Sequence, residues 1–554
     1  TAGDAILKTD ELRDLTGADG SGIIVGVISN GAKGLSEAQQ SGDLPEDVII
    51  LKDGRGSEGT AMMEIIHDIA PNATLLYHDF GGGKDEKFIE AFHNLIQAGA
   101  SIIVEDVGNY EVPYFEDGTI AAGINDILKN NPEIIIISAA GNFADVHYQG
   151  MFLDTGDGYH SFNGSSGIPV TLNPGARLKV VLQWDDPFHA ATNDFDLFLY
   201  DLQTNSDISQ SSKEQTGVEV AFEKLDYQNV GDNPQKTEVR IKAKEGTGKN
   251  PVLLELFLMA DKEKAEIDKS FLTPDDSIFG WSALPGVISV ATISADNMEI
   301  QKFSSQGHVT ISNPALDIRK KPDITGVDYV DVTGSGNFMK KFSGTSAAAP
   351  HIAGLLALIT SLYPNLSTDE ILDALFRSSH DLGEDGWDQI YGYGLADAIS
   401  LYTYLDEKGI SSEHETDNQT TITQEKIVTP SLTPAPSSEY IITESSVLSK
   451  PGKYTLGEDI VDFSDAIITI GGSDIELDGT GHTISGIGVQ FGTAAPILQT
   501  GILVWSSENE ILSNITLKNL AVTGTYAGIS VKQAENLIIK DCEFPYNSRG
   551  IDFS

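Results

Sequence analysis

The sequence is poor in cysteine and in basic residues. Its 554 residues contain one cysteine, Cys542, so no intrachain disulfide framework can form. Only 35 basic residues stand against 82 acidic ones, and the formal charge is −47. This charge argues against nucleic acid or an anionic membrane as a partner. Without disulfides we expect stability to come from packing, with metal ions as a second candidate source, and the acidic charge fits an extracellular, cell-surface or salt-rich setting.

Long apolar runs are also missing. The sequence has no run of 18 apolar residues, so we expect no membrane span within it. Residues 1–4, Thr-Ala-Gly-Asp, have neither the charged nor the apolar part of a signal peptide, and we expect a mature or trimmed form. A chain of 554 residues should hold several domains.

A stretch of small residues holds the candidate nucleophile. Residues 344–351 are Gly-Thr-Ser-Ala-Ala-Ala-Pro-His, and they pass into an apolar run over 352–359 that is long enough for a buried helix. Ser346 would then lie at a helix N-terminus, where unpaired N–H groups and the helix dipole favour developing negative charge. Taken alone, the stretch is equally consistent with a serine that only caps a core helix.

Short apolar runs alternate with helical patterns in the first 140 residues. This alternation predicts an α/β fold with a parallel sheet covered by helices on both faces. Functional sites in such sheets lie at the carboxyl ends of the strands. The predicted strands are 23–28, 48–51, 74–77, 101–104 and 134–137, and the predicted helices are roughly 58–69, 86–98 and 118–130.

The serine stretch resembles the nucleophile motif of the subtilisin-like serine peptidases, G-T-S-M-A-x-P-H-x-x-G, with Ala347 in place of Met. Residues 138–142, Ser-Ala-Ala-Gly-Asn, are similar to the S-A-G-N segment of that family, although Gly-Asn is also common in ordinary turns. The resemblance implies a subtilisin-like fold, peptidase activity on protein or peptide substrates, and no required cofactor. It also implies that the Asn142 amide donates to the oxyanion.

Two positions depart from the subtilisin pattern. The strand end written V-I-D-T-G is Val-Ile-Ser-Asn-Gly over 27–31, so the usual aspartate is absent. The H-G-T motif is Glu58-Gly-Thr, which puts glutamate at the position of the general base. A glutamate at this position resembles the glutamate base of the sedolisins. The sedolisins also have an aspartate four residues after that glutamate, and Met62 stands at that position here. Position alone favours an ordinary acidic residue in the first turn of a helix, and the resemblance to H-G-T with the serine motif downstream favours the general base instead.

The fourth strand ends in Glu105-Asp106, where family members have S-x-G. Alternation sends the two side chains to opposite faces of the sheet. In the subtilisin-like pattern, Asp106 takes the position of the serine of S-x-G, which lies near the general base. We predict that Asp106 is the acid that completes the catalytic triad. The residues expected to line the substrate cleft are Val107, Gly108, Ala139, Ala140 and Gly141.

Residues 150–275 interrupt the α/β pattern. Stretches of period two, separated by Gly, Asn, Asp and Pro turns, predict a β-sandwich inserted between the two parts of a peptidase domain, 1–149 and 276–405. Four aspartates of this insert are candidate calcium ligands, with a merely solvated acidic surface as the alternative. They are Asp185, Asp186, Asp194 and Asp196.

The C-terminal part begins with a polar linker, 406–438, whose composition cannot bury a core. Beyond it, Asn-Ile-Thr-Leu-Lys-Asn at 514–519 recurs as Asn-Leu-Ile-Ile-Lys-Asp at 536–541, an offset of 22 residues. This period predicts that 439–554 form part of a right-handed parallel β-helix, with contact to a cell surface or glycan as a candidate role.

The sequence therefore predicts a secreted or surface serine endopeptidase of the subtilisin/sedolisin type. Ser346 would be the nucleophile, Glu58 the general base, and Asp106 the acid that supports it. The alternative is a catalytically weak or inactive pseudoprotease that binds peptides or glycans at a surface, because two triad positions are altered.

Overall fold

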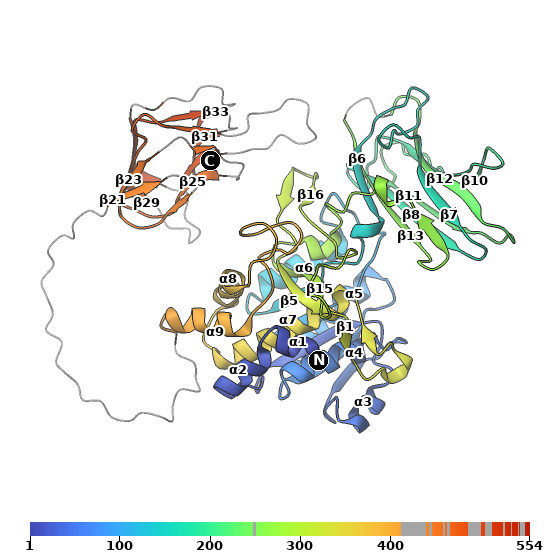
Figure 1. Cartoon of the computed structure of the whole chain (residues 1–554), viewed down its shortest axis with the longest axis horizontal. Coiled ribbons are helices and arrows are strands. Elements are labelled where there is room, and N and C mark those ends of the chain that lie inside the picture. Colours follow the sequence, from blue (N-terminus) through green and yellow to red (C-terminus); the bar gives the residue numbers. More distant parts are fainter. Residues whose placement is uncertain are drawn as a thin grey trace, which may run out of the picture. The chain divides into compact units, whose positions relative to one another are not determined.

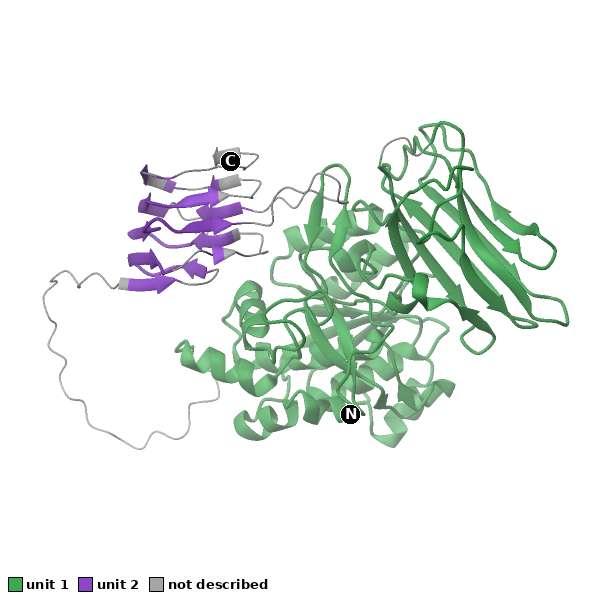
Figure 2. Cartoon of the chain, turned by 45° about the horizontal axis from the view of Figure 1, so that its top comes forward, with its two compact units in different colours: residues 1–420 green, residues 421–554 purple. Residues whose placement is uncertain are grey.

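The computed structural model describes residues 1–247 and 251–410 and shorter segments beyond, namely 439–442, 446–457, 460–461, 466–485, 500–504, 512–523, 527–532, 534–540, 542 and 549–553. These residues belong to two compact units, 1–420 and 421–554 (Figure 2). Most of the predicted linker, from residue 411 to 438, lies outside the described residues.

A seven-stranded sheet forms the centre of the first unit (Figure 1). Its strands all pair in parallel, as the alternation of strands and helices predicts. The predicted strands are present, each within two residues of its expected bounds. In sheet order the strands are β18 (Ile324–Asp328), β15 (Val287–Ser294), β5 (Ile135–Ala139), β4 (Ile102–Glu105), β1 (Ile24–Ser29), β3 (Thr74–Asp79) and β2 (Ile49–Lys52).

Helices cover both faces of this sheet. Val25 and Val27 of β1 share a core with α4 (Glu58–Ile69) and α7 (Thr345–Leu362). Ile28 of the same strand packs into a second core with α5 (Asp85–Gln97) and α6 (Thr119–Asn130). The strand can serve two cores because successive side chains point to opposite faces. The other helices of this unit are α1 (Ala2–Ile6), α2 (Thr9–Thr16), α3 (Leu35–Ser41), α8 (Thr368–Ser378) and α9 (Ala398–Glu407).

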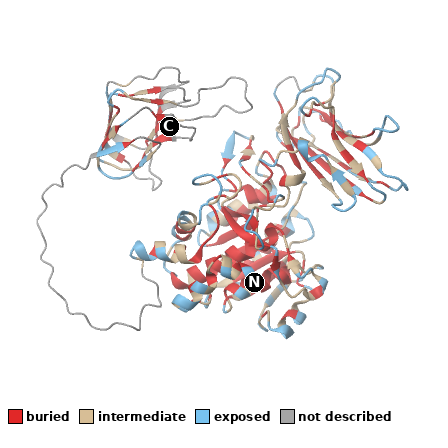
Figure 3. Ribbon diagram, viewed as in Figure 1, coloured by how far each residue is buried: buried red, intermediate tan, exposed pale blue. Residues whose placement is uncertain are grey.

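Helix α7 is buried along nearly its whole length (Figure 3). It packs closely on α4, since a Cβ at Gly354 would lie 2.8 Å from Ile69 Cβ. Its length and hydropathy would suffice to cross a membrane, but 83% of the apolar window is buried inside the fold. Helix α7 is therefore a core helix of this unit, and it begins at the candidate nucleophile.

Strands β6 to β14 form two antiparallel sheets between residues 147 and 267. One sheet has the order β10-β9-β12-β7-β14 and the other β11-β8-β13-β6. Apolar side chains from both sheets, among them Trp184, Leu197 and Leu256, form one buried core. The bounds are β6 (His147–Met151), β7 (Ile168–Leu172), β8 (Arg177–Trp184), β9 (Phe195–Asp201), β10 (Ser206–Ser211), β11 (Phe222–Gln228), β12 (Gln235–Ala243), β13 (Leu253–Ala260) and β14 (Ala265–Ile267).

The second unit consists of stacked parallel strands. They form three sheets, with the orders β21-β23-β26-β29-β32, β22-β25-β28-β31-β33 and β24-β27-β30. The bounds not given below are β21 (Glu439–Ile442), β22 (Ser446–Leu448), β23 (Gly452–Leu456), β24 (Ile460–Val461), β25 (Ala466–Ile470), β26 (Ile475–Asp478), β27 (Thr483–Ser485), β28 (Thr500–Val504) and β30 (Ala521–Thr523). Strand β29 (Leu512–Lys518) pairs with β32 (Ala534–Lys540), and Ile515 lies opposite Leu537. Ile529 of β31 (Ala527–Val531) lies opposite Ile551 of β33 (Arg549–Phe553). Both pairs are 22 residues apart, which is the offset of the sequence repeat.

Candidate active site

The predicted catalytic residues come from neighbouring strand ends and helix starts. Strand β1 ends at Ser29 and strand β4 at Glu105. Ile28 lies opposite Glu105 in the sheet, so the next residue, Asp106, follows β4 beside the end of β1. Helix α4 begins at Glu58, and α7 begins one residue before Ser346. The site therefore lies at the carboxyl edge of the parallel sheet.

Ser346 is the second residue of α7, and 9% of its surface is exposed. The loop before it is held by the buried carboxylate of Asp328, whose Oδ2 accepts bonds from Ser343 Oγ at 2.9 Å and Gly344 N at 2.8 Å. Gly344 has φ +124°, a conformation that residues with a Cβ rarely adopt. These contacts fix the backbone from which the Ser346 hydroxyl projects.

Glu58 lies beside Ser346 and is held by Asn30. Asn30 Nδ2 donates to Glu58 Oε2 at 2.7 Å, and Asn30 Oδ1 accepts from Glu58 N at 3.3 Å. Burial raises the pKa of Glu58, while hydrogen bonding with Asp106, Ser346 and Asn30 acts in the opposite direction. The pKa of Glu58 remains above its ordinary value of 4.5. A carboxylate with a raised pKa is a better proton acceptor than an exposed one.

Asp106 is the second carboxyl of the pair. Burial raises its pKa well above the ordinary value, and the charge of Glu58 raises it further. Ser29 lies beside this carboxyl and lowers its pKa, whereas Asp106 Oδ2 is buried without a hydrogen-bond partner among the described residues. Two buried carboxyls in contact do not both ionise readily, so the pair retains one proton over a wide pH range.

Asn142 follows β5 and is oriented by Thr345. Its Oδ1 accepts bonds from Thr345 N at 3.0 Å and from Thr345 Oγ1 at 3.1 Å, while Thr345 Oγ1 accepts from Gly141 N at 3.1 Å. With the oxygen occupied, the Nδ2 group of Asn142 is left to donate elsewhere. A Cβ at Gly344 would lie 3.1 Å from Nδ2, so the glycine leaves space beside the donor.

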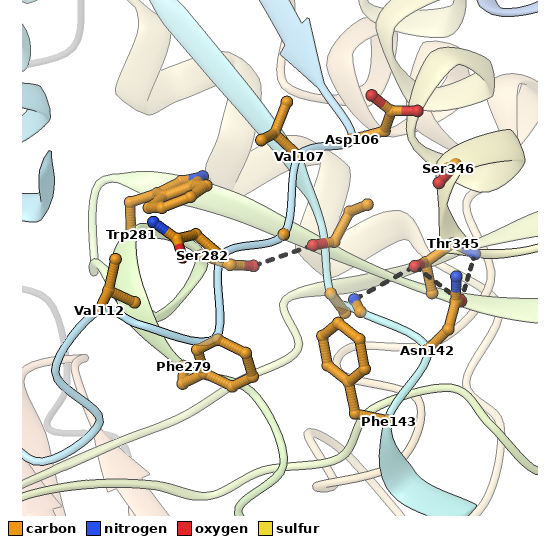
Figure 4. Close-up of a pocket in the computed structure, with 15 residues that line it drawn as sticks. Asp106, Val107, Val112, Asn142, Phe143, Phe279, Trp281, Ser282, Thr345 and Ser346 are labelled. Carbon is orange, nitrogen blue, oxygen red and sulfur yellow. Dashed lines mark hydrogen bonds between the residues drawn. The ribbon is translucent and has the colours of Figure 1, made fainter. Parts of the chain in front are cut away.

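A pocket opens next to Ser346 and Asp106 (Figure 4). It holds about 460 Å³ of empty space, part of it open to solvent. All five residues predicted to contact substrate line it, together with the apolar side chains of Val112, Phe143, Phe279 and Trp281. The predicted residues in its lining are Val107, Gly108, Ala139, Ala140 and Gly141.

Glu105 lies behind this pocket and is fully buried. Its Oε1 accepts from Trp281 Nε1 at 2.9 Å, and its Oε2 accepts from Val107 N at 2.7 Å. It therefore ties one wall of the pocket to the strand end that carries Asp106. Burial raises the pKa of Glu105 to about 7, and its charge also raises the pKa of Asp106.

The four calcium candidates do not form an evident metal centre. Asp186 accepts bonds from Thr192 and Asn193, and Asp194 pairs with Lys244 at 3.0 Å. Burial raises the pKa of both Asp185 and Asp196 to about 6. Across the part of the chain that the structure describes, no three His, Cys, Asp or Glu residues are grouped so that they could hold a metal ion.

Sequence reasoning missed several residues that position the site. Asn30 is only one residue of the strand end that lacks the usual aspartate, yet its amide donates to Glu58. Thr345 was seen only as part of a motif, although it orients Asn142. Asp328 belongs to no recognisable motif. It ends strand β18 and holds the loop at Gly344, 16 residues further along the chain.

A serine at the start of a buried helix, a carboxyl pair beside it and an oriented amide nearby are groups of the kind that serine hydrolases use. Residues 263–394 match the model of the subtilase family of peptidases, Peptidase S8. The matched segment contains Ser346, whereas Glu58, Asp106 and Asn142 lie before it.

Similarity to individual proteins is also partial. The chain is 30% identical over 122 residues to fervidolysin from Fervidobacterium pennivorans, which covers 20% of this chain and 17% of that protein. It is 32% identical over 114 residues to a thermostable alkaline protease from Halalkalibacterium halodurans, which covers 20% and 27%. The matches span less than a third of those relatives. The solved structure of the prenylagaramide maturation protease PagA covers 72% of this chain and 98% of its own, with 14% identity and a TM-score of 0.40.

Proposed function

We propose that this chain is a serine endopeptidase in which Ser346 is the nucleophile and Glu58 the general base. The observation that carries the proposal is the Glu58 carboxyl itself, which contacts Asn30 and also Ser346 and Asp106, two residues that line the pocket. The family match, which includes Ser346, supports the same chemistry.

The geometry supports a two-step mechanism. Ser346 Oγ attacks the peptide carbonyl carbon as its proton passes to Glu58, and the carbonyl oxygen becomes an oxyanion that Asn142 Nδ2 stabilises. Glu58 then returns the proton to the leaving amine, and the C–N bond breaks. In the second step Glu58 takes a proton from water as the water attacks the acyl ester carbon, and it returns that proton to Ser346 Oγ as the ester C–O bond breaks. Asp106 keeps the shared proton beside Glu58 and so sets the basicity of that carboxylate.

Covalent labelling tests this mechanism directly. A fluorophosphonate probe should label the wild-type chain but not Ser346→Ala, and hydrolysis of an unstructured protein substrate should be lost in the same variant. Glu58→Gln keeps the size of the side chain but cannot accept the proton, so it should abolish both reactions while peptide binding persists. Labelling and hydrolysis at wild-type levels in either variant would refute the mechanism. Peptide binding by a wild-type chain that is never labelled would favour the pseudoprotease.

We also propose a domain organisation for the chain. We propose that residues 150–275 are an inserted β-sandwich, because the two antiparallel sheets share one core. Residues 439–554 are proposed as coils of a parallel β-helix, supported by the 22-residue register of the paired strands. A glutamate base would make the peptidase sedolisin-like in mechanism, and the acidic composition supports an extracellular or surface setting. Calcium binding by the insert stays a hypothesis, tested by thermal unfolding with and without a chelator.

A further inference from the structure

A second hollow shares Asn142 and Phe143 with the lining of the catalytic pocket. It holds about 860 Å³ of empty space, part of it open to solvent, and is lined by residues of the peptidase part and of the antiparallel sheets. We call it the insert groove. Its lining residues are Tyr110, Asn142, Phe143, Asp145, Val146, Met259, Ala260, Lys262, Ala265, Ile267 and Lys269.

The insert groove lies next to the catalytic pocket. Asn142 and Phe143 line both hollows, so a polypeptide bound at Ser346 would pass close to the groove. The Phe143 ring packs against two further rings, with its centroid 5.4 Å from that of Phe279 and 5.9 Å from that of Phe257 on β13. The wall shared by the two hollows is therefore a packed aromatic cluster, and strand β13 is part of it.

The charges in the insert groove are unusual for this chain. Two lysines and one aspartate line it, whereas the whole sequence has 82 acidic and 35 basic residues. Lys269 Nζ pairs with Asp145 Oδ2 at 2.7 Å, so these two charges offset each other. Lys262 is exposed at the rim, with its ammonium 5.4 Å from the centre of the Phe303 ring. Among the described residues no carboxylate forms an ion pair with Lys262, so the net charge of the lining is positive.

The groove also offers apolar surface. Val146, Met259 and Ile267 line it together with the lysines. These groups can cover an apolar side chain and attract one carboxylate. That combination matches an extended polypeptide with an acidic residue.

We propose that the insert groove is a substrate subsite that binds the polypeptide next to the scissile bond and selects an acidic side chain through Lys262. This inference rests on the proposed peptidase function, because it takes the chain bound at Ser346 as the ligand. The acidic surface of the rest of the chain repels an acidic substrate. The positive charge of Lys262 therefore favours binding of the acidic segment of the polypeptide in the insert groove.

A peptide series tests the subsite. Each peptide keeps one apolar residue before the scissile bond and carries either Glu or Gln at one position from three residues before to three residues after the bond. We expect the wild type to prefer Glu by about fivefold in kcat/KM at one position, the size typical of an exposed charge pair. Lys262→Gln should remove this preference, and Lys262→Glu should reverse it. The control Lys236→Glu makes the same charge change at an exposed residue of β12 that does not line the groove.

Each outcome decides the question. Equal effects of Lys262→Glu and Lys236→Glu, or a wild type without any Glu preference, would overturn the subsite. A preference that persists in 0.5 M NaCl would also contradict it, because an exposed pair is screened at that ionic strength. If the wild type hydrolyses none of the peptides, the proposed function fails instead. The groove is then judged by calorimetric binding of the Glu and Gln peptides to Ser346→Ala, with and without Lys262→Glu.

Discussion

Changing Glu105 to Gln tests how burial controls the carboxyls of this site. Glu105 is fully buried, and its pKa rises from the ordinary 4.5 to about 7. Because the folded-state pKa is the higher one, this carboxyl stabilises the fold fully only below pH 4.5, and its contribution is lost as the pH rises through 7. Between pH 5 and pH 8.5 the contribution of Glu105 to the free energy of unfolding falls by about 2.5 kcal/mol. The fall is smaller than over the full pH range, because Glu105 in the unfolded chain is already partly ionised at pH 5.

Glutamine does not titrate, so this loss should disappear in the variant. A second effect is independent of pH. Glu105 accepts from Trp281 Nε1 and Val107 N, and Gln has only one oxygen to offer the two donors. An unpaired buried donor costs about 1–3 kcal/mol at either pH. The variant should therefore be less stable than the parent at pH 5 and should gain about 2.5 kcal/mol relative to it by pH 8.5.

The assay is urea unfolding of both proteins at pH 5 and pH 8.5, followed by tryptophan fluorescence. Both carry Ser346→Ala, so that self-digestion does not interfere. Glu86→Gln, which removes the same charge from the exposed start of α5, serves as the control for net charge. A stability difference between the Glu105 variant and this control that stays the same at the two pH values would refute the reasoning. Glu105 would then be ionised in the folded state at little cost.

Three further predictions concern the catalytic groups. Asp106→Asn should lower kcat/KM by about tenfold or more and remove one of the two carboxyl limbs from the pH profile of peptide hydrolysis; an unchanged profile would exclude proton sharing with Glu58. Asn142→Ala should lower kcat by about 10²–10³ with little change in KM, and an effect on KM alone would contradict an oxyanion role. Gly56→Ala would put a Cβ 1.8 Å from Asn30 Oδ1 and so displace Asn30. Because the Asn30 bond lowers the pKa of Glu58, the acid limb should move to higher pH, as it should in Asn30→Ala; a downward shift would show that the bond acts otherwise.

Much of the fold could be predicted from local pattern alone. Runs of Ile, Val and Leu between turns gave the strands of the parallel sheet, because such strands are buried on both faces and need no alternation. Helix α4 begins at Glu58 as the sequence predicts, since Gly-Thr and the following apolar residues set both its start and its buried face. The placement of Ser346 at the start of α7 follows from the same reasoning.

The positioning residues could not be predicted in this way. Asp328 acts on Gly344 across 16 positions, and Thr345 acts on Asn142 across 203. Such contacts depend on where the sheet brings the chain, and local propensity carries no signal for them. The insert groove is a further example, because its walls come from Asn142 and from strands β13 and β14, which the sequence placed in separate domains.

The departures from the subtilisin pattern form one consistent electrostatic arrangement. An imidazole base becomes cationic when it takes a proton, so an aspartate stabilises it. A glutamate base is anionic before it acts, and the V-I-D-T-G pattern would place an aspartate at position 29, where Ser29 now lies beside Asp106. Together with Asp106 and Glu58, that aspartate would make a cluster of three carboxyls, and repulsion would keep Glu58 protonated. Ser29 is neutral, and in the proposed mechanism the Asn30 amide donates a hydrogen bond to the ionised base while Asp106 holds the shared proton. The change at position 29 therefore fits the change at position 58.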